Sequence, residues 1–145
     1  MFTHILLPTD GSNLSQAAIQ KGVQLAKSLK AKITGISVVP EQKYYLYQTG
    51  INIQEKDERA KHHKMQANRK LAVLEKAAKD AGVTCETLCE IGDHPYEAII
   101  RIAEKRGCDL IMMASHGRRG VKGLLLGSET QKVLTHSLIP VLVHR

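Results

Sequence analysis

Apolar and polar positions along the chain follow two alternating patterns. Short apolar runs that end at turn residues predict buried strands, and apolar residues spaced three and four apart predict helices with one buried face. The predicted strands are residues 4–8, 32–40, 83–91, 109–115 and 139–145, and the predicted helices are residues 12–30, 55–80, 94–107 and 128–137. Because strand and helix alternate along the chain, the sequence predicts an α/β fold with a parallel sheet and helices on both faces.

Residues at the element ends support these boundaries. Ser12 or Asn13 can cap the start of the first helix, because their side chains accept hydrogen bonds from backbone N–H groups. Pro95 suits the first turn of a helix. Gly82 and Gly107 suit the ends of the helices that precede them.

The third predicted strand differs from the others because its residues alternate in type. Val83, Cys85, Thr87 and Cys89 share one face, which predicts a half-exposed strand at an edge of the sheet. On such a strand the two cysteines lie roughly 13 Å apart, too far for a disulfide or for one tetrahedral metal site. These cysteines and Cys108 are therefore interpreted as small hydrophobic residues.

The segment 41–53 follows no clear period and is predicted to form a loop or a short irregular helix. It contains Tyr44, Tyr45 and Tyr47, three of the four tyrosines of the chain. Tyrosines can stack on a base or a nucleic-acid strand, but the interpretation favoured here is that they cover the sheet.

Composition narrows the class of protein. The chain has 145 residues, of which 43% are hydrophobic and 24% charged, as expected for one globular domain spanning residues 1–145. No apolar run approaches the roughly 20 residues of a membrane-spanning helix, and the first residues resemble a strand rather than a signal peptide. A cytoplasmic protein without a membrane partner is expected. The net charge of +7 favours anionic partners in general.

Two loops carry the candidate chemistry. Ligands of parallel sheets bind beyond the carboxyl ends of the strands, where the strand order reverses. Pro8, Thr9 and Asp10 follow the first strand, and the glycine-rich segment 114–130 follows the fourth. Glycines let the backbone approach a phosphate, and free N–H groups at a helix start attract it. Ser128 can cap the helix that begins there.

Each of these features also has an ordinary structural interpretation. The glycine-rich segment could be a flexible connection, and Asp10 could cap the first helix. Arg118, Arg119 and Lys122 add positive charge to the segment but could be surface charge, and His116 is interpreted as a loop histidine without a catalytic role. The segment matches neither a P-loop nor a dinucleotide fingerprint.

With these flanks, the glycine pattern resembles the ATP-binding branch of the universal stress proteins of the UspA type. That branch carries Gly, two residues, Gly, nine residues and Gly-Ser or Gly-Thr. Here Gly117 is followed by nine residues and then by Gly127 and Ser128, while Ala114 occupies the first glycine position. The segments "ILLPTDGS", "SVVP" and "SLIPVLVHR" also match the family, so the resemblance covers essentially the whole chain.

The resemblance implies a Rossmann-like (adenine nucleotide alpha hydrolase-like) sheet of five parallel strands in the order 3-2-1-4-5. It implies a site for ATP, ADP or AMP, with Mg²⁺ held through the phosphates and by Asp10 or Ser128. Pro8, Thr9 and Asp10 are expected near the ribose and adenine, with Val38 next to the adenine. The phosphate and ribose side is expected to involve Met113, Ala114, Gly117, Arg118, Gly120, Gly127, Ser128 and Glu129. The Glu129 carboxylate is expected to point away from the phosphates.

The resemblance also implies a homodimer through the C-terminal strand, residues 139–144, and a regulatory role in the stress response through partner proteins still to be identified. The sequence carries no evident catalytic pattern, so slow ATP hydrolysis at most is expected. A stress protein that binds no nucleotide and acts through protein contacts stays open, and Ala114 favours it. A nucleic-acid partner is disfavoured, because the chain has five aromatic residues and no recognised binding motif.

Overall fold

Five parallel strands form the sheet in the computed structural model of the chain, which describes residues 1–41, 53–117 and 125–145. The strands are β1 (His4–Pro8), β2 (Lys32–Val39), β3 (Cys85–Ile91), β4 (Leu110–Ala114) and β5 (Val141–His144). Their order across the sheet is β3-β2-β1-β4-β5, which confirms the expected topology. β1 therefore lies in the middle, and the order reverses between β1 and β4.

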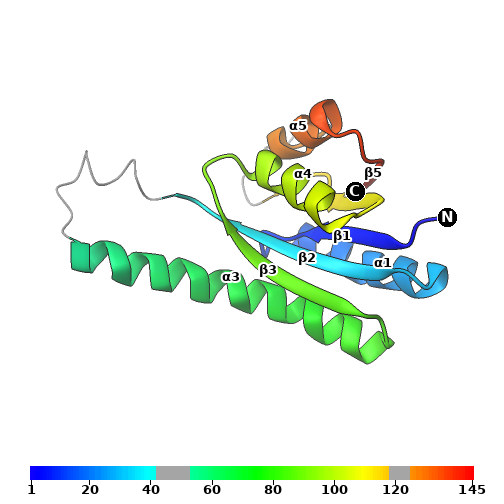
Figure 1. Cartoon of the computed structure of the whole chain (residues 1–145), viewed down its shortest axis with the longest axis horizontal. Coiled ribbons are helices and arrows are strands. Elements are labelled where there is room, and N and C mark those ends of the chain that lie inside the picture. Colours follow the sequence, from blue (N-terminus) through cyan, green and yellow to red (C-terminus); the bar gives the residue numbers. More distant parts are fainter. Residues whose placement is uncertain (42–52, 118–124) are drawn as a thin grey trace.

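Helices cover both faces of this sheet, as the alternating pattern predicted (Figure 1). They are α1 (Asn13–Leu29), α3 (Ile53–Ala81), α4 (Pro95–Arg106) and α5 (Ser128–His136). α1 and α3 pack on one face, and α4 and α5 pack on the other. Each face thus has its own hydrophobic core.

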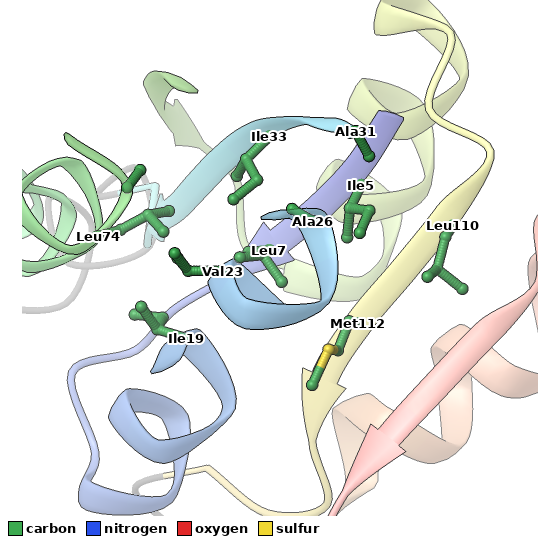
Figure 2. Close-up of a cluster of buried hydrophobic side chains, with 11 residues drawn as sticks. Ile5, Leu7, Ile19, Val23, Ala26, Ala31, Ile33, Leu74, Leu110 and Met112 are labelled. Carbon is green, nitrogen blue, oxygen red and sulfur yellow. The ribbon is translucent and has the colours of Figure 1, made fainter. Parts of the chain in front are cut away.

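The core under α1 and α3 is built mainly from small and branched aliphatic side chains, with Met112 at its β4 side (Figure 2). Ile5 and Leu7 of β1 face Ile19 and Val23 of α1, and Leu74 reaches the same cluster from α3. The second core, under α4 and α5, joins the opposite side of the strands to residues such as Ile99 and Val133. The continuously apolar strands β1 and β4 are buried because they contribute to both cores.

α3 is longer than the sheet that it covers, and its amino-terminal part runs past the strand ends (Figure 1). All of its buried residues lie between Ala67 and Ala78. The first half of the helix is polar and exposed. In the described ranges no helix, including this one, is long and apolar enough to cross a membrane.

The predicted element ends differ from the structure by a few residues, for physical reasons. β3 begins at Cys85 rather than Val83, because the Val83 N–H bonds back to the Ala78 carbonyl at the end of α3 (2.9 Å). Of the two proposed caps of α1, Ser12 is the one that acts: its side chain accepts a hydrogen bond from the Ser15 N–H. The prediction for segment 41–53, including the three tyrosines, lies almost wholly outside the described residues.

The half-exposed character of β3 is confirmed, and the interpretation of the cysteines as small hydrophobic residues stays a prediction. β3 is an edge strand with half-buried residues along most of its length. Cys85, Cys89 and Cys108 are all free cysteines. Burial raises the pKa of Cys85 and of Cys108 to about 11 and also raises the pKa of Cys89. At neutral pH these side chains are therefore neutral thiols, which are weak nucleophiles.

A buried polar chain lies at the amino end of the sheet. His4 is only 4% exposed, and its Nε2 lies 2.7 Å from the Thr34 hydroxyl, which donates a hydrogen bond to Glu86 (2.9 Å). Burial lowers the pKa of His4, and the positive charge of Lys32 lowers it further. The folded protein therefore favours the neutral imidazole.

The lowered pKa of His4 predicts a loss of stability in mild acid. The unfolded chain takes up this proton near its ordinary pKa of 6.5, while the folded chain takes it up only at lower pH. His4 thus contributes stability above pH 6.5 that is lost as the pH falls below that value. Urea titrations at about pH 7.5 and about pH 5.5 give the free energy of unfolding at each pH. We expect it to fall less between the two pH values in His4→Gln than in the unmodified protein. His62→Gln, an exposed change on α3, is the control for replacing a histidine elsewhere in the chain. If His4→Gln and the unmodified protein lose the same unfolding free energy over this pH range, the argument is wrong.

Candidate functional site

The two loops singled out from the sequence meet at the carboxyl edge of the sheet. β1 and β4 are parallel neighbours, with Ile5 opposite Leu110 and Leu6 opposite Ile111, so the segments after both strands lie at the same edge. Their contact is direct: a Cβ placed on Gly117 would collide with Oδ2 of Asp10. The structure therefore brings Asp10 and Gly117 together at the point where the strand order reverses.

The turn after β1 is held by its own polar side chains. The Thr9 N–H donates to the Ile36 carbonyl of β2 (2.9 Å), and the buried Thr9 hydroxyl accepts hydrogen bonds from Gly11 N–H (3.2 Å) and Ser15 Oγ (2.9 Å). Oδ1 of Asp10 accepts a hydrogen bond from Ser12 N–H (2.9 Å). Since Ser12 caps α1, the interpretation of Asp10 as the helix cap is wrong: Asp10 fixes the turn with one carboxylate oxygen and places the other against Gly117.

The segment after β4 is tied to the start of α5 by short hydrogen bonds. Gly127 N–H donates to the Ser115 carbonyl (2.7 Å), and the Thr130 hydroxyl donates to the Ala114 carbonyl (2.9 Å). A Cβ on Gly127 would lie 3.2 Å from the Ser115 oxygen and 3.3 Å from Cα of His116, closer than most Cβ atoms approach a backbone. The glycine at this position thus allows the two backbone segments to pack against each other.

α5 begins without a side-chain cap. Gly127 occupies the cap position and Ser128 is the first helical residue, so the prediction that Ser128 caps the helix is wrong. Glycine offers no side-chain oxygen to the N–H groups of the first turn. Such groups, together with the positive end of the helix dipole, favour an anion at this position.

Glu129, in the same first turn, points its carboxylate at the neighbouring helix. Oε2 accepts a hydrogen bond from the Tyr96 N–H at the start of α4 (2.9 Å), and Oε1 lies 3.4 Å from Nζ of Lys132. Its backbone belongs to the helix start, while its side chain joins α5 to α4.

The other residues predicted for the site lie at the ends of the central strands or outside the described residues. Val38 is half-buried near the end of β2 and packs on the second core, and Pro8 is the last residue of β1. Met113 and Ala114 are buried at the end of β4. Arg118 and Gly120 lie outside the described residues, as do Arg119 and Lys122.

Lys70 of α3 is a residue at this edge that sequence analysis did not find. Its Cγ, Cδ and Cε lie 2.9 to 3.1 Å from the place of a Cβ on Gly11, so its aliphatic stem covers the turn that carries Asp10. Gly11 has a φ of +79°, which glycine adopts without strain. The sequence carries no signal for this contact, because a lysine in a polar helix has the pattern of a solvated residue.

Metal ligation by protein side chains alone receives no support from the geometry. Within residues 1–41, 53–117 and 125–145, no three or more His, Cys, Asp and Glu side chains are grouped so that they could hold a metal ion.

Comparison with known sequences decides the family. The sequence model of the universal stress protein family matches residues 1–145. The chain belongs to the universal stress protein family.

This universal stress protein has similar relatives in archaea and bacteria. Universal stress protein MJ0577 of Methanocaldococcus jannaschii is 34% identical to it, covering 99% of this chain and 94% of the relative. YxiE of Bacillus subtilis is 32% identical and covers 100% of both. The solved structure of MJ0577 superposes with a TM-score of 0.81, covering 99% of this chain and 95% of that one at 30% identity.

A less similar structure, a universal stress protein in complex with cAMP, has a TM-score of 0.70 at 23% identity. It covers 99% of this chain and 97% of that protein. At this identity the comparison concerns the fold.

Proposed function

We propose that this universal stress protein binds an adenine nucleotide (ATP, ADP or AMP), with the phosphates at the start of α5. The observation that carries the proposal is the arrangement of Asp10, Gly117 and Gly127. Gly117 has no room for a Cβ and Gly127 has only tight room for one, and both lie where the two loops meet, beside a helix whose cap has no side chain. The uncapped start of α5 offers its backbone N–H groups to an oxyanion at this meeting point.

The residues at this edge fit such a ligand. Phosphate oxygens would accept hydrogen bonds from backbone N–H groups at Ser128 and Glu129, and the Ser128 hydroxyl can donate another. We expect the ribose and adenine near Pro8, Thr9 and Asp10, with Val38 next to the adenine, as the family resemblance implies. Mg²⁺ would be held through the phosphates and by Asp10 or Ser128, and it would neutralise part of their charge.

A related protein of the same fold supports an adenine ligand. The structure with cAMP concerns another universal stress protein, 23% identical, and cAMP is an adenine nucleotide. The proposal extends this class of ligand to the present chain on the strength of its own glycine and helix geometry. A regulatory role in the stress response would require two conformations of the protein that partner proteins distinguish. The nucleotide would have to bind these two conformations with different affinity. A cytoplasmic location stays a prediction.

The first experiment is mass spectrometry of nucleotide released when the purified protein is denatured, followed by calorimetric titration with Mg-ATP and Mg-AMP. Retained nucleotide, or binding with a Kd in the micromolar range or below, is the expected result. If no nucleotide is retained and the titrations release no heat, the glycine-rich segment does not serve to bind an adenine nucleotide. The alternative, a family member that acts through protein contacts alone, would then replace the proposal.

We further propose a homodimer through the C-terminal strand. β5 is an edge strand of the sheet, so one side of its backbone is available for pairing with a second copy. Three leucines at or near it are exposed: Leu134 (41%), Leu138 (95%) and Leu142 (43%). Apolar side chains along an open edge are a liability for a monomer and are expected at a two-fold interface.

Leu142→Glu is expected to convert this dimer to a monomer. Each copy would bring one glutamate to the interface between the two β5 strands, and the two like charges would repel each other. Light scattering at tens of micromolar should give twice the 16.0 kDa of one chain for the unmodified protein and 16.0 kDa for the variant. Ile91→Glu makes the same change at the opposite edge, where Ile91 is 65% exposed, and should leave the dimer intact. A monomeric unmodified protein would end the proposal.

A further inference from the structure

Glu129 connects the starts of two helices at the candidate site. It belongs to the first turn of α5, and its Oε2 accepts the hydrogen bond of Tyr96 N–H in the first turn of α4 (2.9 Å). In the described part of the chain, the cap residue of α4, His94, makes no side-chain hydrogen bond to that helix. Glu129 therefore supplies from α5 the acceptor that α4 lacks in its own sequence.

The negative charge of Glu129 lies close to two positive helix ends. A carboxylate in the first turn interacts favourably with the dipole of its own helix, and here it also meets the start of α4. Lys132 lies 3.4 Å away, but both side chains are more than a third exposed, so solvent screens this pair. The negative charge that Lys132 leaves uncompensated acts on a ligand at the start of α5 through the same solvent screening, so the expected effect there is modest.

A phosphate at the start of α5 would be attracted by the same positive helix end as the Glu129 carboxylate, and the two negative charges would repel each other. Asp10 adds a second carboxylate on the other side of the site, where its Oδ2 meets Gly117. Each additional negative charge on the phosphates of a ligand would add to its repulsion by the Glu129 carboxylate. The repulsion grows with the number of phosphate charges and falls with added salt.

We propose that Glu129 is a specificity-determining residue of this site, which lowers the preference for ATP over AMP by opposing phosphate charge. The inference rests on the proposed adenine-nucleotide site. It concerns the side chain of Glu129, which turns to α4, and not the N–H group that the helix start offers to phosphate. Glu129 thus has two effects: it joins α4 to α5 by a hydrogen bond, and it limits the charge that the site accepts.

Glu129→Gln separates these two effects. The amide oxygen of glutamine can still accept the Tyr96 N–H, while the negative charge is lost. Glu104→Gln is the matched control, because it changes the net charge equally at an exposed position in the last turns of α4. The Kd values of ATP and AMP are measured by calorimetry without Mg²⁺, at low and at high salt, for the unmodified protein and both variants.

We expect Glu129→Gln to strengthen ATP binding about two- to fivefold, the range given by a charge at a helix start, and to strengthen AMP binding less. High salt should remove most of this difference, and Glu104→Gln should leave the ratio of the two Kd values unchanged. Lys132→Gln, a change at an exposed residue, should shift the ratio in the opposite direction, against ATP. It provides the same test if Glu129→Gln does not fold.

The outcomes distinguish the inference from the function on which it rests. If the unmodified protein binds neither nucleotide, the proposed function fails and the inference fails with it. If it binds both, but Glu129→Gln and Lys132→Gln leave the ratio of the two Kd values unchanged, the inference alone is overturned. A shift of the same size in Glu104→Gln would also overturn it, because net charge and not position would then be the cause.

Discussion

Replacing Leu74 with alanine is expected to lower the free energy of unfolding by about 3 kcal/mol. Leu74 is fully buried where α3 packs on β2, in the core that also contains Ile33 and Leu7. The change removes apolar atoms from the core and leaves a cavity that the surrounding strands can fill only in part. Urea or guanidinium titration measures the loss. Val73→Ala, on the 39% exposed neighbour of Leu74, should change stability by about 0.5 kcal/mol or less.

A second substitution tests whether the packing of Leu74 on β2 has been identified correctly. A Cβ on Gly35 would collide with Cδ2 of Leu74 and lie 3.1 Å from Cγ2 of Thr87. Gly35→Ala alone is expected to cost about 1 to 3 kcal/mol through overpacking. In the Leu74→Ala background the new methyl group enters the cavity, so the double variant should be more stable than the sum of the single effects predicts. Strict additivity would show that the two residues do not share this space.

The fold could be predicted to a large extent because periodicity reports burial. The apolar runs at β1 and β4 are buried on both faces, and the alternation along β3 marks a strand at an edge. Periodicity alone does not give the order of the strands, however. The order 3-2-1-4-5 came instead from the family that the glycine pattern resembles. The glycine pattern itself carries no information on which strands pair.

The candidate site was predictable as a meeting of two loops, but its contacts were not. Once β1 and β4 are neighbours, the segments after them must lie at one edge, and Asp10 does meet Gly117 there. The contact between Glu129 and Tyr96 joins residues 33 apart in the sequence and depends on the packing of α4 against α5. Sequence patterns carry local information, so contacts of this kind become visible only in three dimensions.

The cap of α5 illustrates a second limit of the sequence. Ser128 has the side chain of a typical cap and directly precedes an apolar pattern, yet Gly127 occupies the cap position. Gly127 N–H bonds to the Ser115 carbonyl, and that long-range hydrogen bond fixes where the helix starts. As a cap, serine is favoured over glycine by only a few tenths of a kcal/mol, so the packing of two backbone segments overrides this local preference.

Gly117→Ala is expected to weaken the binding of an adenine nucleotide about tenfold to a hundredfold. The new methyl group would collide with Asp10 Oδ2, so the carboxylate has to shift, which disturbs the hydrogen bond that its Oδ1 accepts from the Ser12 N–H. Overpacking of this kind typically costs about 1 to 3 kcal/mol, and each 1.4 kcal/mol corresponds to a factor of about ten in Kd. Because both loops of the site move, the cost falls on the geometry that the ligand requires, and calorimetric titration with Mg-ATP measures it.

Gly92→Ala is the matched control for this effect. A Cβ on Gly92 meets no atom of the described residues within 4 Å, and its φ is not in the left-handed region, so the added methyl group is tolerated. It lies in the segment after β3, at the same edge of the sheet as the site because the strands are parallel. A control with unchanged Kd, beside a weakened Gly117→Ala that still unfolds cooperatively, would assign the loss to the contact between Asp10 and Gly117. If Gly117→Ala instead binds as tightly as Gly92→Ala, the nucleotide does not depend on the meeting of the two loops, and the site must be sought elsewhere on the carboxyl edge.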